Sequence, residues 1–370
     1  MDNVTHTLFA LTIARTRLGR IGRGSTAALV LASNAPDIDI VTAIGGGANY
    51  MKWHRGPTHG PLGVIGLGLL TAGIVWSYSR WRPFSTQADA NRRDVPFLTL
   101  AALSSVAVLL HVLMDFPTSY GTRLLSPFDW HWFAVDWLPI VDIYLLMALA
   151  AGLAFGHMTP EVRRHNIAIA LLVMAGNYVL RGVSHERALQ LAPRLFGQTL
   201  PPPCGTEPSG MSFIATWPRP PVAVPPTGRR CLVEFAALPT FLSPFQWRVV
   251  AHLSNSYEIH DVDILDRRFL GPPAPSEVLW RTALRVPNQW TPAVTEAAKA
   301  PTARLFLGFS RFPDARAVIG ADGATTVRWT DMRFSDGLFA PNQAPARPAP
   351  FNVTVRLSTD NRIVAEGMGQ

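Results

Sequence analysis

Residues 54–59 read His-Arg-Gly-Pro-Thr-His, and an uncharged apolar stretch, residues 62–78, follows almost at once. The Gly-Pro pair interrupts any regular helix, so we expect the two imidazoles to lie on a turn. Residues 62–78 are long and apolar enough for a membrane helix. Polar groups at the mouth of such a helix are costly and commonly mark a functional site. Two solvated loop histidines would give the same local pattern, but further candidate ligands along the chain favour a site.

The composition is that of a membrane protein with more than one domain. Of the 370 residues, 48% are hydrophobic and only 16% are charged, which is too little charge for an ordinary soluble enzyme. The net charge of +8 does not indicate nucleic-acid binding, because the arginines are grouped beside apolar segments, as membrane topology requires. We therefore expect a lipid bilayer as partner and no nucleic acid. With Asp2 and His6 in place of a basic start, we expect no cleavable signal peptide.

About six apolar segments precede residue 182. Two short ones, 4–14 and 25–35, would each form a helix of about 16 Å, roughly half a hydrocarbon core, and whether they span fully stays open. The longer segments cover residues 62–78, 96–110, 139–156 and 167–180. The predicted fold class is therefore mainly α, a polytopic membrane helical bundle, followed by a small antiparallel β domain.

The arginines and the candidate ligands separate along this topology. If all six segments cross, the arginine-rich turns at 15–23, 80–93 and 163–164 lie on one side, which the positive-inside rule makes cytoplasmic. Both termini then lie outside. The opposite, outer face gathers His6, Asp37, Asp39, His54, His59, His111 and Asp115.

The character of the chain changes near residue 193. Clustered prolines predict a semi-rigid linker over 191–229, between a membrane domain over 1–190 and a β-rich extramembrane domain over 230–370. The strands are predicted from alternating apolar stretches at 247–253, 257–264, 303–309, 325–333 and 351–357. Cys204 and Cys231 are either bridged, if this segment lies in an oxidising compartment, or two unrelated thiols.

The candidate ligands suit a divalent metal. His111 and Asp115 are four residues apart and share a helix face, whereas Asp37 and Asp39 point the same way if their stretch is extended. Nitrogen and carboxylate ligands without thiolates favour zinc, with manganese or iron as alternatives, in a centre of one or two ions. Such an ion activates water for phosphoester hydrolysis, and we assign Asp37, Asp115 and His59 as the catalytic residues.

Several of these residues also suit a purely structural role. Asp37 could cap a helix, Asp115 could pair with Arg123, and His6 is the weakest ligand. Asp142 lies inside an apolar segment as a ligand, the mate of an arginine, or a partner that orients a histidine; we favour the last. An interfacial aromatic belt is predicted from Trp130, His131, Trp132 and Trp137.

Four motifs in order, MDNVTHTLFA, NAPDID, HRGPTHG and HVLMDFPTSYGTRLLSPF, resemble the family of LexA-regulated, inner-membrane, metal-dependent hydrolases (YdjM-like). The resemblance covers about the first 190 residues and implies a multi-span membrane hydrolase. Its motif residues map onto the seven ligand candidates above. Two departures stand out: Gly60 replaces a common serine, and Ile143 replaces a proline after Asp142.

The leading hypothesis is a metal-dependent hydrolase in a bacterial inner (plasma) membrane. Its metal-bound water would attack ester or phosphoester bonds of a lipid or envelope metabolite, with the site and the β domain on the periplasmic face. The alternatives are an ion- or proton-coupled transporter and a non-catalytic envelope protein whose loops are held together by metal. The substrate, the number of metal ions and the oligomeric state are not readable from the sequence.

Overall fold

The computed structural model describes residues 1–81, 93–155, 159–196, 201–204, 213–219, 230–267, 284–288, 290–334 and 351–369. The chain forms two compact units. The first combines Met1–Val41 with Trp53–Gly182, and the second combines Thr42–Lys52 with Val183–Gln370. The domain boundaries that we predict at 190 and 230 stay predictions. Most of the predicted proline-rich linker lies outside the described residues, as do Arg82 and Arg92 of the second arginine-rich turn.

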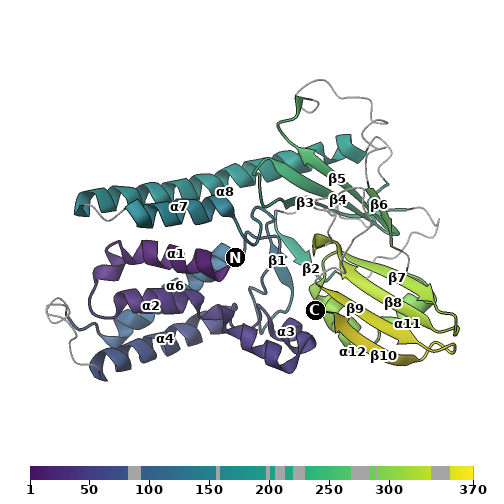
Figure 1. The fold of residues 1–370 in the computed structure, drawn as a ribbon, viewed down its shortest axis with the longest axis horizontal. Coiled ribbons are helices and arrows are strands. Elements are labelled where there is room, and N and C mark those ends of the chain that lie inside the picture. Colours follow the sequence, from purple (N-terminus) through teal and green to yellow (C-terminus); the bar gives the residue numbers. More distant parts are fainter. Residues whose placement is uncertain are drawn as a thin grey trace. The chain divides into compact units, whose positions relative to one another are not determined.

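The first unit is helical (Figure 1). Its elements are α1 (Asn3–Ala14), η1 (Leu18–Arg20), α2 (Ser25–Asn34), η2 (Pro36–Gly45), α4 (Pro61–Trp81), α6 (Phe97–Asp115), the short strand β1 (Trp132–Ala134), α7 (Ile143–Ala154) and α8 (Pro160–Phe196). Helix α3 (Gly47–Trp53) follows η2. Both η2 and α8 continue from one unit into the other.

Small and apolar side chains hold α2, α4 and α6 together. Their shared core contains Ala28 and Ala32 of α2, Ala72 of α4, and Leu100 and Ala107 of α6. Helix α1 packs against α2 on one side and against α7 on the other. The site end of this bundle is where α1 and α4 begin and where α2 and α6 end, because His6 of α1, Asp37 just after α2, His59 just before α4, and His111 and Asp115 of α6 meet there.

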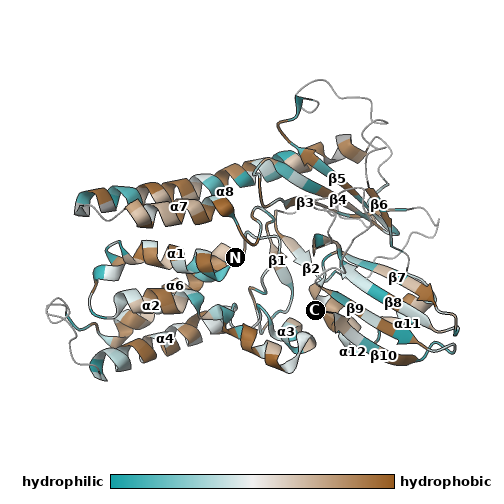
Figure 2. Ribbon diagram, in the orientation of Figure 1, coloured by the Kyte–Doolittle hydropathy of each residue, from teal (hydrophilic) through white to brown (hydrophobic). Residues whose placement is uncertain are grey.

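Six membrane crossings are not supported. Among the described residues, three helical segments are long and apolar enough to span: Pro61–Trp81, Phe97–Asp115 and Arg164–Leu191. A fourth is formed if α2 and η2, bent by 45° at their junction, act as one span. Helices α1 and α7 have 12 residues each, about 18 Å, which is too short for a hydrocarbon core of about 30 Å. Figure 2 shows that α4 and α7 are both largely hydrophobic. Hydropathy therefore does not distinguish the short α7 from the long α4.

The predicted segment 139–156 is shortened at its start by Asp142. Its carboxylate accepts hydrogen bonds from the backbone N–H groups of Tyr144 and Leu145, both at 3.0 Å, and so fixes the start of α7 at Ile143. The predicted segment 167–180, by contrast, is part of the much longer helix α8. Beyond Gly182, α8 carries an apolar face of Ala188, Leu191 and Leu195, which packs against the sheet of the second unit.

The second unit contains an antiparallel sheet domain, as the sequence predicts. One sheet has the order β3-β4-β5-β6 and the other β10-β9-β8-β7, with all neighbours antiparallel. The strands are β2 (Ala215–Trp217), β3 (Leu232–Pro239), β4 (Gln246–Leu253), β5 (Ser256–Asp263), β6 (Leu284–Pro287), β7 (Pro313–Ile319), β8 (Thr325–Asp331), β9 (Asn352–Leu357) and β10 (Ile363–Gly369). The remaining elements are α11 (Pro292–Ala297), α12 (Pro301–Phe309) and η4 (Met332–Phe334).

The first sheet is covered on both faces. Val250, Tyr257 and Ile259 on one face join a core with Phe312 and Met332, and Trp247 and Val249 on the other face join α8. The predicted strand at 303–309 is wrong, because these residues form α12. Pro301 opens that helix, and Ala303, Phe306 and Phe309 are buried at a helical spacing.

Cys204 and Cys231 form a disulfide, so the bridged alternative holds. The aromatic belt is wrong at Trp132, which is fully buried in β1 under the guanidinium of Arg123, 4.4 Å from the centre of the indole ring. Trp130, which is 40% exposed, fits the predicted position better.

Candidate metal centre

The turn predicted at residues 54–59 delivers a histidine to the start of α4. The N–H of Gly56 donates to the carbonyl of Trp53, and the N–H of His59 donates to the carbonyl of Gly56, both at 2.9 Å. Arg55 adopts a left-handed backbone conformation with φ of 49°, an uncommon state for a residue with a side chain. These two consecutive turns bring the buried His59 ring over the ends of α2 and α6.

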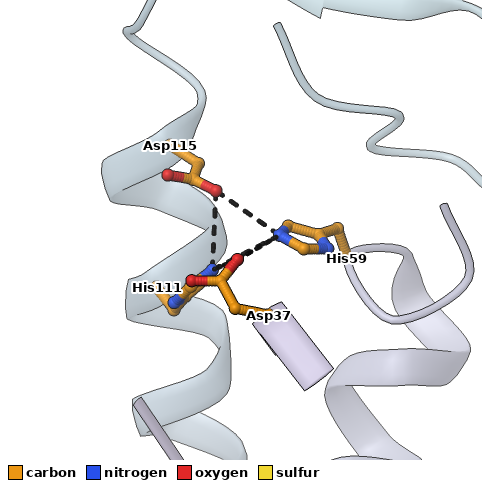
Figure 3. A group of neighbouring side chains, drawn as sticks. All are labelled: Asp37, His59, His111 and Asp115. Carbon is orange, nitrogen blue, oxygen red and sulfur yellow. Dashed lines mark hydrogen bonds and ion pairs between the residues drawn. The ribbon is translucent and has the colours of Figure 1, made fainter. Parts of the chain in front are cut away.

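Four side chains from three segments of the chain converge at this point (Figure 3). Asp37, His59, His111 and Asp115 each offer one ligand atom, and these four atoms lie within 4.8 Å of one another. The Nε2 atoms of His59 and His111 are 3.3 Å apart, and each lies 3.4 Å from Asp115 Oδ2. Asp37 Oδ1 lies 3.7 Å from His59 Nε2 and 3.6 Å from His111 Nε2.

The five separations given above are close to the edges of a tetrahedral metal site. Bonds of about 2.0–2.2 Å from zinc to nitrogen and oxygen put neighbouring donors about 3.3–3.6 Å apart. The three histidine–histidine and histidine–Asp115 distances fall within that range, and the Asp37 distances lie at or just above its upper end. Two nitrogens and two carboxylate oxygens are also a donor set that divalent zinc, manganese and iron accept.

The Nδ1 atoms of His59 and His111 have their own hydrogen-bond partners, so the Nε2 atoms are the ones that can bind metal. His111 Nδ1 lies 2.7 Å from the carbonyl of Ser33, which can only accept, so the proton sits on Nδ1. His59 Nδ1 lies 3.0 Å from the hydroxyl of Thr58. A proton on each Nδ1 places both Nε2 lone pairs toward the shared point, where two lone pairs 3.3 Å apart repel unless a cation lies between them.

Unsatisfied polar atoms at the same point also fit a cation. Among the described residues, the buried atoms Asp37 Oδ2 and Asp115 Oδ2 make no hydrogen bond, and neither ring nitrogen of His6 does. Buried polar atoms without partners are rare in folded proteins, and a carboxylate oxygen is especially costly to leave so. The donor set, the distances and these atoms therefore agree with a bound divalent ion.

Asp39 and His54 lie beside the cluster and pair with each other. Asp39 Oδ1 is 3.2 Å from His54 Nδ1, and Asp39 Oδ2 accepts the backbone N–H of Arg55 at 2.7 Å and the hydroxyl of Thr58 at 3.5 Å. Asp39 thus holds the turn that carries His59. Burial lowers the pKa of His54 below its usual value, which keeps the ring neutral.

The expectation that Asp37 and Asp39 point the same way is wrong. It assumed an extended backbone, whereas Pro36–Gly45 is a 3₁₀ helix with three residues per turn. Residues two apart are then about 240° apart around the axis, so Asp37 faces the cluster and Asp39 faces the turn.

His6 contacts the opposite oxygen of Asp115. Its Nε2 atom lies 3.3 Å from Asp115 Oδ1, and its ring stacks on that of His111 with centroids 3.8 Å apart. The ring is completely buried, and this burial lowers its pKa well below the usual value. Arg55 reaches the same Oδ1 atom at 3.2 Å, and the amino group of Met1 contacts it as well. Arg55 is therefore the arginine that pairs with Asp115, a role that the sequence left open for Arg123.

Asp142 is the mate of an arginine rather than a partner that orients a histidine. Its Oδ2 atom lies 2.6 Å from Arg181 Nε, and both side chains are fully buried. With its other oxygen capping α7, Asp142 joins the start of α7 to α8.

Sequence reasoning missed Arg55, Thr58 and Ser33, although two of the three lie inside the His-Arg-Gly-Pro-Thr-His motif. Arg55 and Thr58 could have been proposed from their position between two candidate histidines. The role of Ser33 could not, because its backbone carbonyl makes the contact and any residue would supply one. Gly60, where a serine was expected from the resemblance, also has a structural reason. A Cβ atom at this position would overlap the backbone oxygen of Ser126.

Comparisons with known proteins agree with this organisation. A family model described as YdjM inner membrane protein matches residues 1–188. An uncharacterized protein of Bacillus subtilis, YfhP, is 29% identical over 162 residues, which cover 43% of this chain and 45% of that protein. The chain therefore matches less than half the length of this relative. No solved structure matches.

Proposed function

Because the chain belongs to the family of YdjM inner membrane proteins, we propose that its helical unit is a metal-dependent hydrolase that acts on ester or phosphoester bonds at the membrane surface. The observation that carries this proposal is the convergence of Asp37, His59, His111 and Asp115 within 4.8 Å at one end of the helices. These four residues would hold the ion. LexA regulation is no part of the proposal.

The chain's own residues supply positioning and proton transfer. When bound, a divalent ion polarises the ester group and lowers the pKa of the water that it carries. Ser33 and Thr58 hold the imidazoles in the ligating tautomer. Asp37, which is partly exposed while the other three ligands are buried, is the carboxylate that substrate and solvent can reach. We assign it the role of general base.

A lipid substrate is supported by the surface beside Asp37. On η2 the carboxylate of Asp37 faces the cluster and that of Asp39 faces the turn, whereas Ile38, Ile40 and Val41 are 54%, 63% and 55% exposed. Helix α4 starts at the site and carries exposed Leu62 and Ile65 on its first turns. Apolar side chains that surround a polar centre favour a substrate held in the outer layer of a bilayer.

We further propose that the site lies on the periplasmic side of the inner membrane. The arginine-rich turn after α1 meets the start of α6, because the N–H of Arg23 donates to the carbonyl of Arg93. This is the end opposite the ligands, and the positive-inside rule assigns it to the cytoplasm. The disulfide of the second unit is also typical of an oxidising compartment.

The test uses full-length protein in detergent, stripped of metal and reloaded with zinc or manganese. We expect release of phosphate or a soluble headgroup from vesicles that contain lipid phosphomonoesters or phosphodiesters, and loss of that activity in His59→Ala and His111→Ala. Asp129→Asn, which changes a carboxylate outside the cluster, serves as the matched control. Metal-loaded protein that is inert on both lipid classes would contradict the proposal, and metal flux without hydrolysis would favour a transporter.

A further inference from the structure

Arg55 lies where a second metal ion would have to bind. The two oxygens of Asp115 face different groups: Oδ2 faces His59 and His111, and Oδ1 faces His6, Arg55 and the amino group of Met1. A carboxylate with nitrogen donors on both sides is the arrangement that bridges two metals in dinuclear centres. Here, however, the guanidinium of Arg55 approaches Oδ1 at 3.2 Å, next to the ring of His6.

We propose that Arg55 takes the place of a second cation and makes the centre mononuclear. The inference rests on the proposed metal site and concerns its ion count. Arg55 is a positioning residue, since it contacts a ligand rather than the substrate.

The first support is that the guanidinium is fixed from several sides. Its Nη1 group donates to the carbonyl of Gly121 at 2.9 Å and to the hydroxyl of Thr122 at 3.4 Å, and it lies 4.8 Å from the centre of the Tyr120 ring. The side chain is only 4% exposed. Such a group cannot move aside cheaply for a metal ion, because each of these buried contacts would be lost.

The backbone of Arg55 is held as firmly as its side chain. Its N–H donates to Asp39 at 2.7 Å, and its carbonyl accepts from the N–H of Arg123 at 3.3 Å. Its left-handed conformation, with φ of 49°, persists only where the surroundings enforce it. The turn therefore aims the guanidinium at Asp115 before any ion binds.

The second support is the charge of the buried cluster. Asp37, Asp39 and Asp115 carry three negative charges, which one divalent ion and Arg55 balance. A second divalent ion would leave an excess of two positive charges among buried groups, and any charge on the amino group of Met1 would add to it. Uncompensated buried charge is strongly unfavourable, so a second ion costs more while Arg55 is present than after its charge is removed.

Removal of Arg55's charge should open this second position. In Arg55→Met the long apolar stem remains, but Asp115 Oδ1 and His6 lose one of the two cationic groups beside them, and the amino group of Met1 stays. Arg55→Lys keeps the charge and is the matched control. His6→Ala in the Arg55→Met background removes the nitrogen ligand that a second ion would need.

The experiment measures manganese and zinc per chain by elemental analysis of full-length protein in detergent, with the electron paramagnetic resonance spectrum of the manganese form. We expect one ion per chain and the spectrum of an isolated ion in the wild type, Arg55→Lys and the His6/Arg55 double variant. Two ions and a coupled spectrum are expected in Arg55→Met.

The outcomes separate this inference from the proposed function. A wild type that binds two coupled ions overturns the inference but not the metal site, whereas a wild type that binds none overturns both. A folded Arg55→Met protein that still binds one ion overturns the role of Arg55. Where Arg55→Met does not fold, the wild type decides: one isolated ion per chain supports the mononuclear centre, and two coupled ions overturn it.

Discussion

We expect Asp37 to bind the metal ion and Asp39 to hold the turn that carries His59. A comparison of Asp39→Asn with Asp37→Asn tests these two roles. Asp39 accepts the N–H of Arg55 at 2.7 Å, meets His54 at 3.2 Å and reaches the Thr58 hydroxyl at 3.5 Å. An asparagine keeps the shape, but it removes the charge and turns an amide NH₂ toward at least one of these groups. The loss is that of one charge-assisted hydrogen bond, about 1.5–3 kcal/mol.

Loss of this hydrogen bond in Asp39→Asn should raise the dissociation constant for metal without lowering the number of ions bound at saturation. When the turn is less often in its native conformation, the apparent dissociation constant rises by the same factor. A penalty of about 1.5–3 kcal/mol corresponds to roughly 10–150-fold, close to the range of about 10–100-fold found for groups that orient metal ligands. Asp37→Asn removes a ligand charge directly, so we expect a loss beyond about 100-fold.

The assay is chelator competition with zinc on full-length protein in detergent, together with the number of ions per chain at saturation. Asp39→Asn should still saturate at the wild-type number. Asp129→Asn, which alters an exposed carboxylate paired with His131, should bind as the wild type does. Equal losses in Asp37→Asn and Asp39→Asn would refute these two roles, and so would an Asp39→Asn protein that binds no ion at saturation.

Further changes test other parts of the structure. His111→Ala should abolish saturable metal binding, as ion counts will show, because it removes a ligand that the carbonyl of Ser33 orients. Arg181→Met should lower the free energy of unfolding by about 3–5 kcal/mol in chemical denaturation, because it strands the buried Asp142, while the ion count stays unchanged. Cys231→Ser should cost about 3.5 kcal/mol in the same assay, since the disulfide closes a chain separation of 27 residues. Phe306→Ala should cost about 3–5 kcal/mol by emptying a fully buried position under α12, and a loss below 1 kcal/mol would contradict that packing.

Four of the seven ligand candidates converge in the structure, and the sequence pointed to them through local properties. His111 and Asp115 share a helix face whatever surrounds them, and the Gly-Pro break makes a turn of residues 54–59 in any context. The sequence did not predict which of two neighbouring candidates, such as Asp37 and Asp39, would lie in the cluster. Asp37 and Asp39 differ only through the 3₁₀ geometry of η2, which no pattern in ten mostly apolar residues announces.

The number of crossings was overestimated for a related reason. Apolar composition reports that a segment avoids water, but not whether lipid or protein covers it. Phe9 of α1 and Leu145 and Leu149 of α7 are buried against each other and against α8, so their apolar character serves packing within the unit. The prediction of a strand at 303–309 was wrong because seven residues are too few to distinguish the alternating apolar pattern of a strand from the three-residue apolar spacing of a helix.

The convergence of Asp37, His59, His111 and Asp115 does not depend on the number of membrane crossings. Helix α4, with 21 residues, and α6, with 19, have lengths of about 32 and 28 Å. His59 lies in the turn just before α4, and His111 and Asp115 lie in the last turns of α6. Helices α1 and α2 reach the site end of the bundle by packing on each other and along α7 and α6, respectively. The cluster therefore needs only that the ends of these segments lie together. The hydrogen bond from His111 to the carbonyl of Ser33, the last residue but one of α2, holds the end of α2 against α6 at the cluster.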